Sequence, residues 1–201
     1  MSSTSSQLII SGVIDGPLSG GGLPKAVELY ALSDIADLSA YGIGTANNGD
    51  GTDGEEFTFP SDSATAGDYI TISFESTEFS NFFGYTPNYT DVVELFFNGD
   101  DAIELFFNGA VVDVFGEIDV DGTGEPWEYK DGWARRIDGS VPSGTTFQVT
   151  EWVFSGPDAL DPCATNDSCS PTVPFKSFVV SKCHHMHSLL FYTLVLTANP
   201  F

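Results

Sequence analysis

The sequence predicts an all-β protein of antiparallel strands, and three observations support this. Two Asn-Gly pairs ten residues apart, Asn98-Gly99 and Asn108-Gly109, each follow an apolar run typical of a strand. The 21 Gly and 11 Pro favour many turns. No stretch combines a 3.6-residue apolar period with helix caps. The 201 residues are 41% apolar and include 17 Phe, so one domain with a real core can form.

The two Asn-Gly pairs end the copies of a near-repeat, VELFFNG at 93–99 and IELFFNG at 103–109. Asn and Gly tolerate φ > 0, which the two central residues of a type I′ hairpin require. Residues 91–116 are therefore predicted to form a three-stranded meander.

Counting back from Asn108-Gly109 predicts the register of the second hairpin. Leu105 is expected opposite Val112 on the core face, and Glu104 opposite Asp113 on the outer face. Like charges opposite one another are mildly destabilising. We expect solvent to screen the repulsion between these two carboxylates. A bound cation, Arg135 or Arg136 could do so instead.

The remaining strands are expected at short apolar segments between Gly-, Asp- and Pro-rich turns. Residues 77–89 are aromatic but contain Gly84 and Pro87, so they are predicted to form a packed loop. Outside the meander the expected strands are 7–14, 26–31, 56–59, 68–74, 128–137 and 145–154.

The chain divides into a polar leader at 1–6, a sandwich at 7–178 and an atypical tail at 179–201. The tail contains Cys183 and all three His, and no Asp or Glu follows Asp167. Its apolar run of about ten residues is too short for a membrane-spanning helix of about 20. We interpret it as lying outside the sandwich; an added strand or a membrane-associating end is the alternative.

Several segments, in this order, resemble the lamin-tail domain family. The resemblance covers roughly residues 8–178 and is closest to the type found in secreted nucleases and surface proteins of bacteria and microbial eukaryotes. It implies an immunoglobulin-like antiparallel β-sandwich with a binding or targeting role rather than a catalytic one. The segments are 8–11 with 25–30, 37–41, 66–70, 97–105 with 108–109 and 111–116, then Trp127, Arg135-Arg136, Glu151-Trp152 and Pro174-Phe175.

The charge is strongly acidic, with 29 Asp and Glu against 6 Lys and Arg and a formal net charge of -23. Such a surface suits solvation in a salty medium or the binding of cations. Nucleic acid is disfavoured as a partner, because phosphate contacts need a basic surface. This argues against the DNA association known for some lamin-tail domains.

Other features suit an extracellular domain of a longer secreted protein, although residues 1–6 do not resemble a signal peptide. Asn88 and Asn166 begin N-glycosylation triplets. Cys163 and Cys169 bracket a polar loop that a disulfide could close, and two free thiols are the alternative.

Catalysis is not expected within residues 7–178, because every His lies at 184–187 and a Ser-His or Cys-His pair would lack its base. The Cys183–His187 segment has ligand types for a soft metal but no partner cluster.

One acidic loop begins like an EF-hand but lacks its twelfth-position Glu, which is Lys130 here. This excludes an EF-hand and leaves an irregular calcium site of Asp119, Asp121 and Glu125 as a candidate, with the loop at 48–53 as a weaker one.

The expected function is a non-catalytic interaction or accessory module of a secreted or surface protein, with an unknown protein or carbohydrate ligand. Two alternatives remain. One is a fragment of an extracellular nuclease or phosphatase whose catalytic domain lies elsewhere. The other is a calcium-dependent adhesive module.

Overall fold

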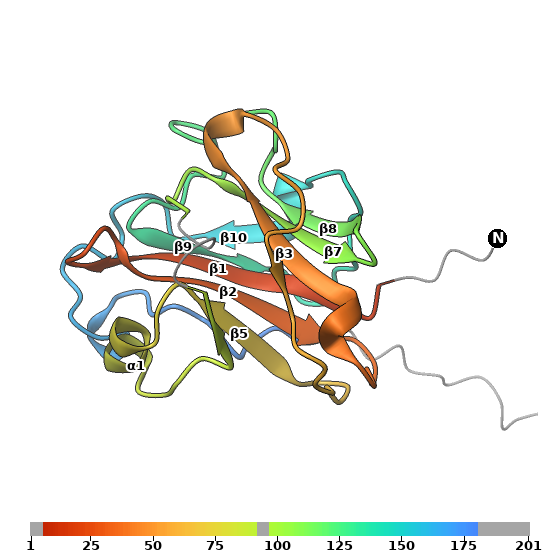
Figure 1. The fold of residues 1–201 in the computed structure, drawn as a ribbon. Helices are drawn as coiled ribbons and strands as arrows, with labels where there is room; N and C mark the ends of the chain where they lie inside the picture. The colour runs from red at the N-terminus through yellow and green to blue at the C-terminus, as the bar shows by residue number, and fades with distance from the viewer. Residues whose placement is uncertain (1–5, 92–96, 181–201) are drawn as a thin grey trace, which may run out of the picture.

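Two β-sheets face each other and enclose the main core (Figure 1). The computed structural model describes residues 6–91 and 97–180. The larger sheet has the strand order β10-β9-β1-β2-β5-β6, and the smaller has the order β4-β3-β7-β8. Within the described residues every strand pair is antiparallel except β5–β6. The predicted all-β sandwich is confirmed.

The elements follow one another with short connections, and most of the predicted strands have a counterpart. The strands are β1 Leu8–Leu18, β2 Leu23–Ala31, β3 Tyr41–Ala46, β4 Phe57–Thr58, β5 Tyr69–Ser73, β6 Tyr89–Thr90, β7 Ala102–Phe107, β8 Ala110–Phe115, β9 Gly132–Arg136 and β10 Trp152–Phe154. One α-helix, α1 Thr77–Phe83, and 3₁₀ helices at Leu38–Ala40, Asn47–Gly49, Val149–Glu151 and Asn166–Ser168 complete the description.

The core between the sheets is built from side chains that alternate along the strands. In β1 a bulge between Ile10 and Gly12 shifts the register, so Leu8, Ile10 and Val13 all face the core. Phe115 at the end of β8 contacts Trp152 of β10, with ring centroids 4.7 Å apart. This contact joins the two sheets through aromatic packing.

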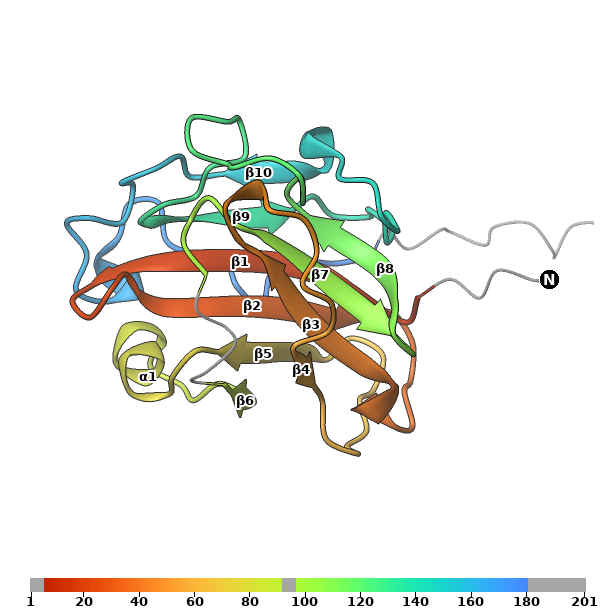
Figure 2. The same cartoon turned by 45° about the horizontal axis from the view of Figure 1, so that its top comes forward.

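The other face of the larger sheet is covered by α1 and the C-terminal segment 157–178 (Figure 2). Phe79 and Phe82 of α1 pack there with Trp133 of β9. Phe178 is fully buried against Ile9 and Tyr30. The contact continues one residue beyond the predicted end of the sandwich, since the Gly139 N–H donates to the Val179 carbonyl. Residues 181–201 of the predicted tail, and residues 1–5 of the leader, lie outside the described residues.

The prediction of a packed loop over 77–89 is wrong for its first half, which forms α1. The Glu75 carboxylate accepts hydrogen bonds from the N–H groups of Thr77, Glu78 and Phe79, which the start of a helix leaves unpaired. Gly84, with φ of 74°, ends the helix. Seven residues span only two turns, too few for a helical period to be visible in the sequence.

The second Asn-Gly pair forms the predicted hairpin turn. Asn108 has φ of 50° and Gly109 has φ of 74°, as a type I′ turn requires. The strands it joins, β7 and β8, lie in the middle and at the edge of the smaller sheet. The prediction from the Asn-Gly signal is confirmed at this turn.

The predicted register of this hairpin is wrong beyond its first two pairs. A shift between Leu105 and Phe106 makes Leu105 the partner of Asp113 and Glu104 the partner of Val114. Val112 is the extra residue of a β-bulge. Because side chains alternate, the one-residue shift turns Asp113 from the expected outer face toward the larger sheet.

The first Asn-Gly pair does not form a two-residue hairpin turn. The Asp101 N–H donates to the Asn98 carbonyl at 3.1 Å, so Gly99 and Asp100 are the central residues of this turn. A Cβ on Gly99 would lie 2.1 Å from the Lys130 backbone. Glycine is therefore required here because the two backbone segments approach each other closely. The first strand of the predicted meander, at 92–96, lies outside the described residues.

Asp113 is fully buried and accepts hydrogen bonds from three parts of the chain. Arg136 Nη2 of β9 donates to its two oxygens at 2.9 and 2.8 Å. The Ile10 N–H of β1 donates at 2.8 Å, and Ser143 donates from its N–H at 2.9 Å and its hydroxyl at 3.1 Å. Burial raises the pKa of Asp113, and the Arg136 charge and these donors oppose the rise.

Arg136 has a matching set of partners. Its Nε donates to the Ile10 carbonyl at 2.7 Å and its Nη1 to Glu151 Oε2 at 3.1 Å. Its guanidinium carbon lies 4.6 Å from the ring centroid of Trp152. The ion pair therefore ties the smaller sheet to the larger one and to the loop at 141–143.

Replacing Asp113 by Asn should destabilise the protein strongly, because it leaves the Arg136 guanidinium buried without its carboxylate. Breaking one side of a buried pair costs about 3–5 kcal/mol. Urea unfolding at neutral pH measures the change. Asp158→Asn is the matched control: its pair with Lys130, at 3.9 Å, is more than half exposed on both sides, so the loss there should stay below about 1 kcal/mol. Equal losses in the two variants would contradict the assigned role of Asp113.

Candidate functional site

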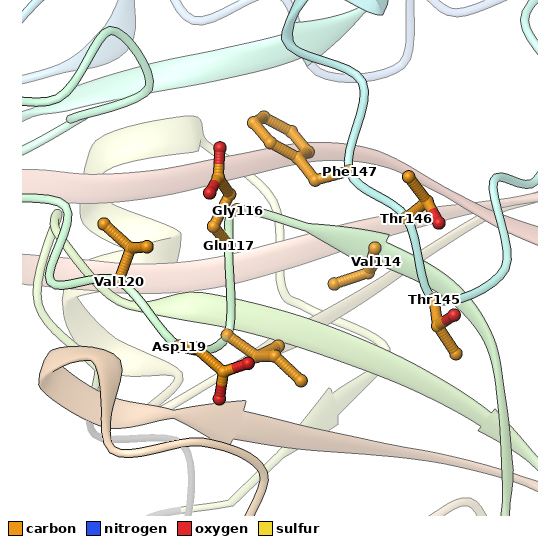
Figure 3. Close-up of a pocket in the computed structure, with 9 residues that line it drawn as sticks. Val114, Gly116, Glu117, Asp119, Val120, Thr145, Thr146 and Phe147 are labelled. Atoms are coloured by element: carbon orange, nitrogen blue, oxygen red, sulfur yellow. The ribbon is translucent and has the colours of Figure 1, made fainter.

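A cleft of about 370 Å³ lies where β8 ends (Figure 3). Two segments form it: the chain from Val114 of β8 to Val120, and the stretch 145–147. Its lining residues are Val114, Gly116, Glu117, Ile118, Asp119, Val120, Thr145, Thr146 and Phe147.

Tight local packing shapes this cleft. Gly116 has φ of 81°, and a Cβ there would lie 2.9 Å from the side chain of Ala102 and 3.0 Å from the Trp127 ring. Only glycine lets the chain leave β8 at this angle. The Val120 N–H donates to the Glu117 carbonyl at 3.1 Å and closes the following turn.

The opposite wall is anchored in the core. Phe147 packs edge-on against Phe115, with centroids 5.5 Å apart, and against Trp127 at 6.2 Å. These contacts fix the stretch 145–147 beside β8. The same aromatic cluster that joins the two sheets therefore also holds this wall of the cleft in place.

The lining of the cleft combines acidic, hydroxyl and apolar side chains. Glu117 and Asp119 are exposed, whereas Val114, Ile118, Val120 and Phe147 supply apolar surface. No Lys, Arg, His or Cys is among its lining residues. Such a set suits a cationic group carried on an apolar stem, and it offers no pair of nucleophile and base.

The structure does not gather the three residues of the tentative calcium site. Asp119 lines the cleft, but Asp121 Oδ1 accepts the Thr123 N–H at 2.9 Å, a bond that lowers the Asp121 pKa. Glu125 is exposed on the next turn. Among the described residues, the one group of three carboxylates whose oxygens lie within 4.8 Å of one another is elsewhere, at Asp131, Asp158 and Asp161. Its members are too far apart in sequence to form a recognisable motif.

The weaker candidate loop at 48–53 packs against the acidic loop at 119–125. The Gly51 N–H donates to the Ile118 carbonyl at 3.0 Å. A Cβ on Gly49 would lie 2.4 Å from the Asp121 backbone nitrogen. The loops at 48–53 and 119–125 are therefore neighbours. Together they make the edge of the molecule beside the cleft strongly acidic.

The predicted cysteine and glycosylation residues lie away from the cleft. Cys163 and Cys169 form a disulfide, with Cα atoms 5.2 Å apart. Asn88 is exposed, and its Oδ1 accepts the Thr71 N–H at 2.9 Å. Asn166 Nδ2 donates to the Val173 carbonyl, so a glycan on that nitrogen would displace a structural hydrogen bond. The Cys183–His187 segment lies outside the described residues.

Glu28 of β2 is a buried carboxyl that the sequence did not single out. Ser11 Oγ donates to its Oε1 at 2.8 Å, and the Lys176 N–H donates to its Oε2 at 2.6 Å. Burial raises the pKa of Glu28 to about 7, against the effect of these two donors. Only 1% of the residue is exposed. A perturbed pKa can mark a functional site, but this carboxyl is closed to any substrate and has a structural role.

Comparisons with protein-family models, with curated proteins and with solved structures found no match to this chain. None of the helices in the described ranges, 6–91 and 97–180, has the length and apolar character of a membrane span.

The free energy of unfolding should fall as the pH rises from about 4.5 to about 7, in part because of Glu28. Between these values the unfolded carboxyl loses its proton while the folded one keeps it, so the unfolded state binds fewer protons. The shift corresponds to about 3 kcal/mol at 1.36 kcal/mol per pKa unit. Glu28→Gln should flatten the slope in a series of urea melts across this range, whereas the exposed Glu117→Gln should leave it unchanged. An unchanged slope in Glu28→Gln would show that this carboxyl is already ionised at pH 5.

Proposed function

We propose that this chain is a non-catalytic interaction module of a secreted or surface protein, of the lamin-tail type with an immunoglobulin-like sandwich. We further propose that its cleft binds a basic segment of a protein partner. The observation that carries this proposal is that the carboxylates of Glu117 and Asp119 and the apolar side chains of Ile118, Val120 and Phe147 line one cleft. The ordered motif resemblance supports the family and its binding role.

The way the chain uses its few basic residues supports a cationic partner. Five of the six Lys and Arg lie in the described part, and each contacts an acidic side chain or an aromatic ring. The contacts are Lys25 with Asp15, Lys130 with Asp158, Arg135 with Asp138, Arg136 with Asp113, and Lys176 over the Tyr85 ring. The acidic majority therefore dominates the field outside the protein and attracts cations.

The lining of the cleft suits the chemistry of a Lys or Arg side chain. The aliphatic stem of such a side chain gains by lying on apolar surface while its charged head stays wet. Ile118 and Val120 offer that surface, and Glu117 and Asp119 offer carboxylates for the head. Opposite charge over the whole domain would also speed the encounter.

Binding of a labelled peptide that alternates Lys with Leu tests this function by fluorescence anisotropy. We expect binding to the wild type that weakens with salt and is absent for the same peptide with Glu in place of Lys. Asp119→Asn should weaken it about two- to fivefold, as expected for an exposed ion pair worth up to about 1 kcal/mol.

Asp167→Asn is the matched control, because it removes the same charge at an exposed position in another part of the fold. It should leave the affinity nearly unchanged. Equal weakening in both variants would mean that the peptide responds only to net charge, and no binding at all would reject the cleft as its site.

A further inference from the structure

Glu104 of β7 lies on the outer face of the smaller sheet, yet only 2% of it is exposed. Its Oε2 is buried and has no hydrogen-bond partner. A carboxylate oxygen that is removed from water and left unpaired is strongly unfavourable, and native proteins rarely keep one. The position therefore requires a partner beyond the described protein atoms.

The cover over Glu104 is the loop at 51–56, which lies across β3. Gly44 of β3 is the direct cross-strand neighbour of Glu104. A Cβ on Gly44 would lie 2.0 Å from the Gly54 carbonyl oxygen, so that oxygen sits on the sheet next to Glu104. The Thr52 side chain of the same loop makes a hydrogen bond to the Glu104 carboxylate.

A second carboxylate approaches from the edge of β3. Glu56 Oε2 accepts the Thr45 N–H at 2.7 Å and the Thr45 hydroxyl at 2.9 Å. Burial raises the pKa of Glu104, the Thr52 hydrogen bond lowers it, and the charge of Glu56 raises it again.

No positive side chain balances the two carboxylates. Within the described part of the chain, neither Glu104 nor Glu56 takes part in an ion pair. The neighbouring groups that could serve as ligands all offer oxygen atoms: the Glu56 carboxylate, the Gly54 carbonyl and the Thr52 hydroxyl. Calcium takes six to eight oxygen ligands of these kinds, and water can complete the shell.

We propose that a calcium ion binds under the 51–56 loop, between Glu104 and Glu56, with the Gly54 carbonyl and the Thr52 hydroxyl as further oxygens. The ion would satisfy the buried oxygen, relieve the repulsion between the two carboxylates and fasten the loop to β7. The site shares Thr52 with the loop at 48–53 that the sequence indicated, and it does not depend on peptide binding at the cleft.

Calcium titration of the full chain, by calorimetry and by thermal melts at matched ionic strength, tests the proposal. We expect saturable binding of one ion and a rise in Tm that sodium chloride does not reproduce. Glu104→Gln should weaken calcium binding at least about tenfold, since loss of even a supporting residue costs a metal site that much. Asp167→Asn, which removes an exposed carboxylate in another part of the fold, should bind calcium like the wild type.

Thr52→Val is a second variant in case Glu104→Gln does not fold. Because Thr52 is exposed, the Thr52→Val protein should still fold, and it should bind calcium more weakly than the wild type. Equal effects of sodium and calcium on the wild type would overturn the proposal and leave a protonated Glu104 as the explanation. Calcium binding that is unchanged in Glu104→Gln or Thr52→Val would also overturn it.

Discussion

The buried pair of Asp113 and Arg136 is the interaction on which the relation of the two sheets depends. It joins β8 of the smaller sheet to β9 of the larger one, and both partners bond the backbone of Ile10 between them. Moving two charges out of water is costly, and only the full set of donors and acceptors around them offsets that cost. The pair therefore requires one arrangement of β1, β8 and β9. The bulge at Val112 turns the Asp113 side chain toward Arg136.

A second constraint is the absence of side chains on one face of β3. Gly42 and Gly44 leave room for the loop at 54–56 to lie on the smaller sheet, where any Cβ would collide with it. The loop then buries Glu104 and brings the acidic segments 48–53 and 119–125 together. The proposed calcium site and the acidic edge beside the cleft both follow from these two glycines.

The distribution of charge links the fold to the proposed functions. The described basic residues are used in internal contacts, two of them, Lys25 and Arg136, almost fully buried. The carboxylates that remain have no internal counter-charge, so cations from outside, as ions or as basic side chains, are the natural complement. In the two proposals, a calcium ion secures the loop at 51–56 and a basic partner occupies the cleft beside β8.

The sequence by itself determined the local features of this protein. Asn108-Gly109 adopts its turn because those two residues accept φ > 0, and the apolar segments of β1, β2 and β5 could be recognised as strands from their own residues. The tertiary structure alone decided which of the charged side chains are buried. A shift of one residue reverses the face of a strand, so the bulge that turned Asp113 inward could not be found by counting from the turn. The burial of Glu104 likewise depends on a loop about fifty residues away in sequence, and only packing against glycine in β3 brings that loop over it.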